Sequence, residues 1–176
     1  EQGESRLEYL LSQAERQTRQ ALEPFGYYNP VIKVEAPRED EHVRVLIHVD
    51  KGAPVTVRRE HIDITGPAIY DQYLQDDLAA FKPRKGQRFE HTQYEASKIT
   101  ITRRLAERGY FDADYTQRQV QITRADNAAD IDLTWDSGRR YNMGPVRFVQ
   151  DYFVDKLFDP LVYWDQGSYY HEGKLD

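Results

Sequence analysis

The feature that most constrains the fold of this chain is an internal repeat. One helical stretch closes with the residues LEPFGYY around Gly26, and another closes with LAERGYF around Gly109, 83 positions later. Each of these glycines is followed by an extended segment, a turn, a second extended segment and a further glycine. The further glycines, Gly52 and Gly138, lie 86 positions apart. Self-similarity at a fixed spacing is typical of a tandem array of small modules, so we expect several small cores instead of one large core.

The repeat divides the 176 residues into one whole module between two partial ones. Residues 1–53 are predicted to hold a helix over residues 5–25 and strands over residues 31–35 and 43–50. Residues 54–138 form a complete module. Residues 139–176 open a third module, with a strand and a short helix over residues 146–161.

Both partial modules lack elements that the middle one has, so the chain is expected to be a fragment cut inside its first and third modules. The first partial module has no first strand and no first helix. Exchange of elements with a second copy would complete such modules, and a strand-swapped or domain-swapped homo-oligomer is therefore one expectation.

The middle module starts with a strand, predicted over residues 55–64 from the alternation of apolar and polar residues. A short helix follows, and its apolar side is predicted at Tyr70, Leu74, Leu78 and Phe81. Thr92 and Glu95 have the spacing of a capping box, which predicts that the second helix begins at Thr92.

Two strands complete the middle module, over residues 115–124 and 130–136. In the second of them Ile131, Leu133 and Trp135 alternate with polar residues, which indicates one buried face. The element order is strand, helix, helix, strand, strand. It predicts an α+β fold in which two helices pack on one face of a three-stranded mixed sheet.

The strand over residues 115–124 has few apolar residues and several glutamines, which indicates the edge of the sheet. An open edge presents unpaired amide and carbonyl groups, and an extended peptide of almost any sequence can pair with them. The predicted client- and partner-binding residues lie on the second-to-last strand of each module: Val31, Lys33, Glu35, Tyr115, Gln117, Gln119 and Gln121. An ordinary polar edge without a binding role explains the same pattern, so both interpretations stay open.

Gly26 and Gly109 are predicted to be structural turns. A residue that ends a helix often needs a positive φ angle, which glycine adopts without the steric cost that other residues incur. The aromatic residues that follow each glycine can then fold back onto the helix end.

Composition and motifs argue against several function classes. The formal net charge of −6 provides no positive field for nucleic acid, and the absence of cysteine excludes thiol chemistry. No serine has a nucleophile-elbow pattern and the histidines are scattered, so no enzyme activity, metal or cofactor is expected. Two alternatives stay open. One is an α/β domain that binds a ligand or cation on the acidic strand face Asp130, Asp132 and Asp136, and the other is a passive structural spacer.

Four stretches of the chain resemble POTRA domains, the polypeptide-transport-associated repeats of outer-membrane protein assembly factors. They are LEPFGYYNP at residues 22–30, RGYFD at 108–112, DLTWDSGRRY at 132–141 and GPVRF at 144–148. The resemblance implies the periplasmic portion of an outer-membrane protein, with its own C-terminal β-barrel. It implies a scaffold that binds unfolded outer-membrane clients, including autotransporters, and a TamB-like partner anchored in the inner membrane.

Overall fold

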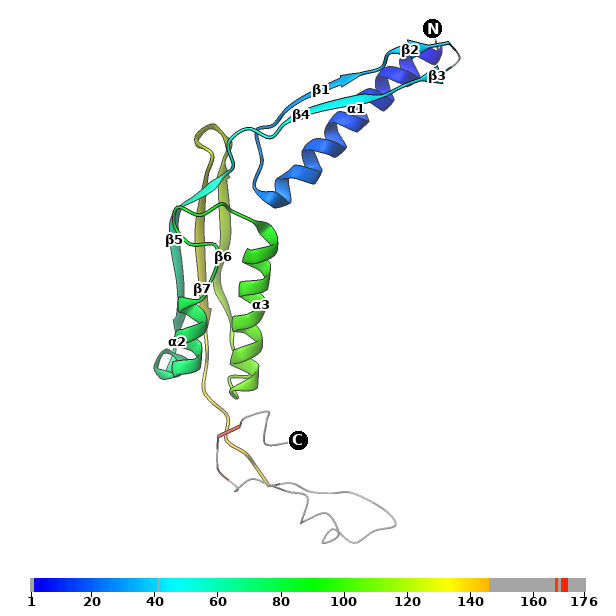
Figure 1. Ribbon diagram of the computed structural model, residues 1–176. Coiled ribbons are helices and arrows are strands. Elements are labelled where there is room, and N and C mark those ends of the chain that lie inside the picture. Colours follow the sequence, from blue (N-terminus) through cyan, green and yellow to red (C-terminus); the bar gives the residue numbers. More distant parts are fainter. Residues whose placement is uncertain (1, 41, 146–166, 168, 171–176) are drawn as a thin grey trace, which may run out of the picture. The chain divides into compact units, whose positions relative to one another are not determined.

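The structure is a computed structural model that describes residues 2–40, 42–145, 167, 169 and 170 (Figure 1). It contains helices together with largely antiparallel strands that follow one another in groups, which confirms the predicted α+β fold. None of the helices in these ranges has both the length and the apolar character needed to cross a membrane.

By their contacts the described residues form two compact units. Unit 1 is drawn from residues 1–60, 82–96 and 119–131, and unit 2 from residues 61–81, 97–118 and 132–176. Because this grouping follows spatial contacts and not the repeat, the predicted division into three modules is not tested by it and stays a prediction.

The N-terminal part of unit 1 is a helix beside a β-hairpin (Figure 1). Its elements are the helix α1 (Gln2–Leu22), a 3₁₀ turn (Glu23–Phe25), and the strands β1 (Val31–Glu35), β2 (Arg38–Glu39), β3 (His42–Val43) and β4 (Leu46–Asp50). Strand β1 pairs antiparallel with β4, and β2 pairs antiparallel with β3.

The prediction of one continuous strand over residues 43–50 is wrong. The strand is interrupted at Arg44 and Val45, which separate β3 from β4. The Arg44 amide donates to the Pro37 carbonyl at 3.1 Å, outside the regular ladder, and its guanidinium pairs with Glu39. These contacts hold the chain in a short separate hairpin at this point.

The larger sheet has three strands in the order β5–β7–β6. They are β5 (Thr56–Thr65), β6 (Asp114–Thr123) and β7 (Ala128–Asp136). The Thr56 amide donates to the Asn127 carbonyl at 3.0 Å, and the Ser137 amide donates to the Thr65 carbonyl at 2.9 Å, so β5 runs parallel to β7. A short turn joins β6 to β7 and makes that pair antiparallel. The sheet is therefore mixed, as predicted.

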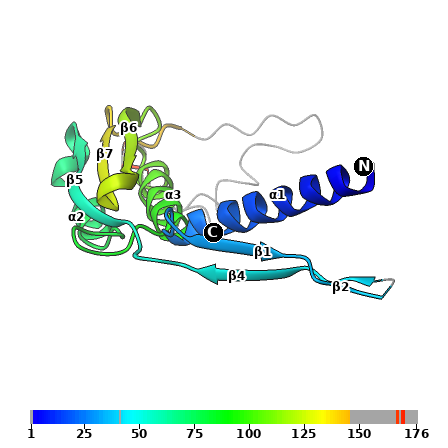
Figure 2. The ribbon, with the colours of Figure 1, turned by 90° about the horizontal axis from the view of Figure 1, so that it is seen from above.

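Helices α2 (Gln72–Ala79) and α3 (His91–Glu107) cover one face of this sheet (Figures 1 and 2). The predicted buried face of β7 is confirmed, because Ile131, Leu133 and Trp135 are all buried. Leu74 from α2 and Ile101 from α3 are also buried, and they complete the apolar layer between helices and sheet.

Two predictions about these helices are wrong. Tyr70 was expected on the apolar side of the first helix, but it ends a separate 3₁₀ turn (Pro67–Tyr70) and is 92% exposed. Asp71 caps α2 directly after it, so the helical period starts only at Gln72. The second helix begins at His91, and the Glu90 carbonyl accepts from the Tyr94 amide at 3.1 Å. Thr92 therefore lies inside the first turn and not at the cap.

The internal repeat extends to individual hydrogen bonds. In the first copy the Val55 amide donates to the Gly26 carbonyl at 2.7 Å, and in the second the Tyr141 amide donates to the Gly109 carbonyl at 2.9 Å. A second pair of bonds also corresponds. The Gly86 amide donates to the Val57 carbonyl at 2.7 Å, and the Gly167 amide donates to the Met143 carbonyl at 2.8 Å. The residues described after Gly138 therefore begin as the residues after Gly52 do. The strand and helix predicted over residues 146–161 lie outside the described residues.

The two copies of the last strand differ in burial. Ile47 on β4 corresponds in the repeat to Leu133 on β7, yet Ile47 is 43% exposed and Leu133 is fully buried. Val45 and Val49 are likewise exposed where their counterparts are buried. In the part of the chain that the structure describes, β4 pairs with β1 alone, so nothing there takes the place that β5 has beside β7.

Candidate functional site

Strand β6 is the first candidate site, because the sheet order places it beside β7 alone. Within the described residues no strand pairs with its other side. The predicted residues Tyr115, Gln117, Gln119 and Gln121 all lie on β6, and their spacing of two puts them on one face of the strand. The structure thus places them at an open edge, while their role in binding stays a prediction.

A groove of about 250 Å³ lies between the C-terminal half of α3 and the start of β6. Thr102, Leu105 and Ala106 of the helix line it, together with Tyr115 of the strand. The Tyr115 ring packs on Trp135 with centroids 5.0 Å apart, and the Trp135 indole N–H donates to the Thr102 hydroxyl at 3.2 Å. These contacts fix the side chains that line the groove, which is a place where side chains of an added strand could lie.

The edge of β6 has few of the features that usually protect a sheet edge from pairing. The strand is ten residues long and contains no proline and no lysine. Gln117, Gln119 and Gln121 are exposed and neutral, and Arg118 lies over the Tyr115 ring at 4.9 Å. Natural edges are commonly blocked by charges, proline or a short length, and β6 has only Asp114 and Arg118 as charges, so we expect it to be open to strand addition.

Strand β1 in unit 1 is the second predicted edge. Its burial alternates, so that Val31, Lys33 and Glu35 are exposed while Ile32 and Val34 are half-buried. Each strand of this two-stranded sheet has one side without a partner strand among the described residues. The structure therefore also places Val31, Lys33 and Glu35 on a strand with an open side.

The predicted turn glycines hold the helix ends that flank these edges. Gly26 has a φ of 92° and Gly109 a φ of 90°. The Tyr110 amide donates to the Leu105 carbonyl at 2.9 Å, which closes the end of α3. A Cβ atom at Gly109 would lie 3.1 Å from the Cβ of Tyr170, so this turn needs glycine for its backbone angle and for its neighbours.

We expect Gly109→Ala to lower the free energy of unfolding by more than Gly86→Ala does. Both glycines have positive φ, which costs an alanine about 1 kcal/mol, but a Cβ atom at Gly86 meets nothing within 4 Å. Only the Gly109 variant adds contacts tighter than normal packing. Urea denaturation followed by circular dichroism measures both, and equal losses would show that the Tyr170 contact does not constrain the turn.

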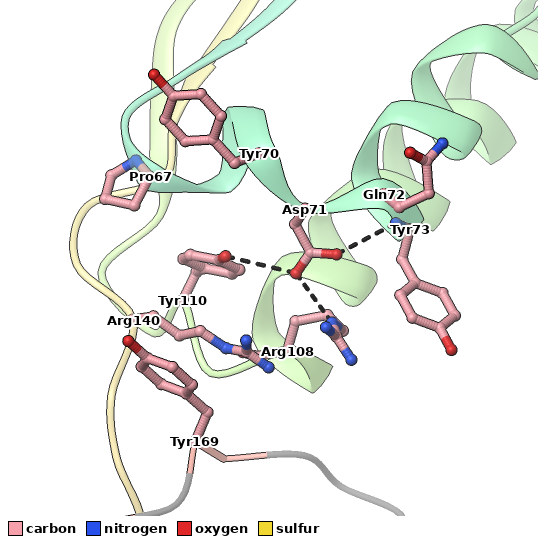
Figure 3. Close-up of a pocket in the computed structure, with 9 residues that line it drawn as sticks. All are labelled: Pro67, Tyr70, Asp71, Gln72, Tyr73, Arg108, Tyr110, Arg140 and Tyr169. Carbon is pink, nitrogen blue, oxygen red and sulfur yellow. Dashed lines mark hydrogen bonds and ion pairs between the residues drawn. The ribbon is translucent and has the colours of Figure 1, made fainter.

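A second cluster, which no sequence pattern predicted, lies in unit 2 around Asp71 (Figure 3). Arg108 Nε donates to Asp71 Oδ2 at 2.9 Å, and the Tyr110 hydroxyl donates to the same oxygen at 3.4 Å. The Tyr73 amide donates to Asp71 Oδ1 at 3.1 Å. Burial first, and then the Asp71 carboxylate, raise the pKa of Tyr110 above its ordinary value.

This cluster lines a shallow pocket of about 360 Å³, which we call the arginine–tyrosine pocket. Its lining residues are Pro67, Tyr70, Asp71, Gln72, Tyr73, Arg108, Tyr110, Arg140 and Tyr169 (Figure 3). They come from four separate stretches of the chain. No periodic pattern in the sequence connects such stretches. The one local feature that points to this place is Asp71, an aspartate directly before the short helix α2.

The acidic strand face does not form a common site. Arg58 donates to Asp130 at 2.7 Å, His61 contacts Asp132 at 3.2 Å, and Asp136 Oδ1 accepts from the Gly138 amide at 3.2 Å. The hydrogen bond from Arg58 holds the pKa of Asp130 below its usual value. Each carboxylate thus has its own partner, and within the described residues no three acidic or histidine side chains are grouped as metal ligands would be.

Comparison with known proteins finds two family models. The model described as POTRA domain TamA domain 1 matches residues 1–51, and the POTRA model described as surface antigen variable number repeat matches residues 57–138.

Solved structures of outer-membrane assembly proteins are also similar. BamA POTRA3–5 from Haemophilus influenzae is 24% identical with a TM-score of 0.50, and the match covers 86% of this chain and 59% of the BamA chain. This chain therefore spans less than two thirds of that structure, and the likeness concerns the fold. BamA POTRA4 from the same organism is 22% identical, with a TM-score of 0.36, and the match covers 48% of this chain and 95% of that structure. POTRA1–3 of Omp85 from Anabaena is 14% identical, with a TM-score of 0.39, and the match covers 93% of this chain and 67% of that structure.

Proposed function

This chain belongs to the POTRA domains of outer-membrane assembly proteins, and on that premise we propose that it binds client β-strands at the open edge of β6. The single observation that supports the proposal is a ten-residue edge strand without proline or lysine beside a groove of about 250 Å³. Backbone hydrogen bonds would supply affinity for many sequences, and the groove would accept alternate side chains. A protein that handles many different barrel clients needs this combination.

POTRA domains are the periplasmic, non-catalytic part of Omp85-type outer-membrane proteins. For this chain we propose the corresponding location, ahead of a C-terminal β-barrel of its own polypeptide. The proposed clients are unfolded outer-membrane proteins, including autotransporters, which the parent protein would help to insert. The match of residues 1–51 to a TamA-type model supports TamB as the proposed inner-membrane-anchored partner.

The division into modules at residues 1–53, 54–138 and 139–176 is also a proposal. The matched hydrogen bonds around Gly26 and Gly109 support it. Strand exchange between two copies is proposed on the unpaired side of β4, and light scattering of the purified chain would distinguish a dimer from a monomer. The strand β1, with Val31, Lys33 and Glu35, is the proposed second edge for a partner.

Gln119→Pro is expected to abolish most crosslinking between β6 and an unfolded barrel segment, while the fold persists. Proline removes an amide donor and is tolerated at a sheet edge. The matched control is Gln119→Ala, which removes the side chain and keeps the amide, and it should crosslink as the parent does. The measurement uses a photoreactive residue at position 117 and a fluorescent barrel-strand peptide.

Equal crosslinking by the proline and alanine variants would refute pairing through the backbone of β6. A passive spacer would give no crosslinking above that of an unrelated peptide, even with the parent sequence. Circular dichroism of each variant confirms that the comparison is between folded proteins.

A further inference from the structure

The arginine–tyrosine pocket has an unbalanced charge. Two guanidinium groups, of Arg108 and Arg140, line it together with one carboxylate, that of Asp71. The neighbouring Arg104 adds no excess positive charge to the pocket, because its Nε donates to the Asp77 carboxylate at 2.9 Å. One additional negative charge would therefore balance the pocket.

Both guanidinium groups hold donors in reserve. Arg108 uses Nε for Asp71, and Arg140 uses Nε for the Arg108 carbonyl at 2.6 Å and one terminal nitrogen for the Tyr170 carbonyl at 3.4 Å. In the described part of the chain, the terminal nitrogens of Arg108 and Nη1 of Arg140 make no further hydrogen bond. A guanidinium has five N–H donors, so both groups can bind an oxyanion without breaking their present contacts.

Aromatic rings form the rest of the lining. Tyr70, Tyr73 and Tyr169 are each more than half exposed, although they are large side chains. Arg108 lies over the Tyr73 ring at 4.5 Å, and Arg140 lies over the Tyr169 ring at 4.6 Å. Tyrosine and arginine are among the residues that are enriched where proteins bind one another, so this lining suits a peptide.

We propose that the arginine–tyrosine pocket binds a carboxylate of a peptide segment, with Arg108 and Arg140 donating to its oxygens. Tyr73, whose ring lies under the Arg108 guanidinium, contacts an apolar side chain next to that carboxylate. The site is separate from strand pairing at β6, because it uses side-chain donors and needs no backbone ladder. It goes beyond the proposed function by adding a second recognition element for a protein partner.

The surroundings favour a single carboxylate over an extended anionic surface such as a membrane. Arg104 pairs with Asp77, and Arg103 pairs with Glu107, so the basic residues near the pocket on α3 already have acidic partners. A lipid surface attracts extended clusters of unpaired basic residues, and the described basic residues 103 and 104 of α3 do not extend the pocket into one.

The test is an NMR titration of the isotopically labelled 176-residue chain with N-acetyl-L-phenylalanine, which carries one carboxylate beside one aromatic side chain. The neutral control ligand is N-acetyl-L-phenylalanine amide. We expect saturable shifts of the Arg108 and Arg140 side-chain N–H signals, and at least tenfold weaker binding of the amide. Equal affinities of acid and amide would overturn the proposal.

Matched variants locate the site. Arg140→Gln should weaken binding of the acid at least tenfold, whereas Arg139→Gln, at the exposed neighbour outside the pocket lining, should leave it unchanged. Should Arg140→Gln unfold, the test rests on Tyr73→Ala, which alters a side chain that is 51% exposed and should weaken binding severalfold.

Two further ligands distinguish other anion sources. If inorganic phosphate shifts the same signals with the same affinity as N-acetyl-L-phenylalanine, the pocket is a general anion site and the proposal is overturned. Binding to phosphatidylglycerol vesicles that is lost in Arg140→Gln would overturn it in favour of a membrane contact. If neither effect is seen and the acid binds at least tenfold more tightly than the amide, the results support binding of a peptide carboxylate.

Discussion

Leu133→Ala is expected to lower the free energy of unfolding by about 3 kcal/mol, because it leaves a cavity in the apolar layer between β7 and the helices. Leu133 is fully buried at the centre of the sheet. Urea denaturation followed by circular dichroism and tryptophan fluorescence measures the loss, since Trp135 lies two residues away on the same buried face.

The internal repeat provides a matched control for this variant. Ile47 occupies the corresponding position of the first copy and is 43% exposed. Ile47→Ala should therefore cost less than about 1 kcal/mol, as surface substitutions usually do. Equal losses at Leu133 and Ile47 would contradict the difference in burial between the two copies and show that β4 is covered in solution.

Asp71→Asn is expected to cost about 3 kcal/mol, because it leaves the Arg108 guanidinium without its carboxylate in a largely buried position. The side chains of Asp71 and Arg108 are 4% and 16% exposed. Asparagine still accepts a hydrogen bond from the Tyr73 amide and caps α2, so the loss reports the missing charge. Thermal and urea unfolding both measure it.

The control for Asp71 is an ion pair of similar length on the surface. Asp126 accepts from Arg58 at 3.1 Å, and its side chain is 59% exposed. Asp126→Asn should cost at most about 1 kcal/mol, because water screens the pair and solvates the remaining guanidinium. An Asp71 variant that is no less stable than the Asp126 variant would refute a buried role for the pair.

Local patterns predicted much of the fold. Alternation along residues 130–136 identified the buried face of β7, since successive strand residues face opposite sides whatever surrounds them. The glutamine-rich pattern of residues 115–124 predicted an edge, and the structure places β6 at one. In each case the residues of a single strand were sufficient for the prediction.

The errors arose where a neighbouring element decided the outcome. Tyr70 has the spacing of a helical apolar residue, but Asp71 starts α2 after it and leaves Tyr70 in solvent. Thr92 has the spacing of a cap, yet the Phe89 amide donates to the Val55 carbonyl at 2.9 Å, and the chain turns into α3 directly after that contact. A pattern of spacing contains no information about a partner strand.

By itself, the sequence determined the repeat, because two stretches can be compared without any contact between them. It also determined most of the order of elements, the glycine turns and the edge pattern of β6, because each depends on residues close together in the chain. Only the tertiary structure decided the arginine–tyrosine pocket. Arg108 meets Asp71 across 37 positions, and Arg140 meets the Arg108 carbonyl across 32. Contacts over such separations form only when packing brings the elements together, since nothing in the local period of any one stretch encodes them.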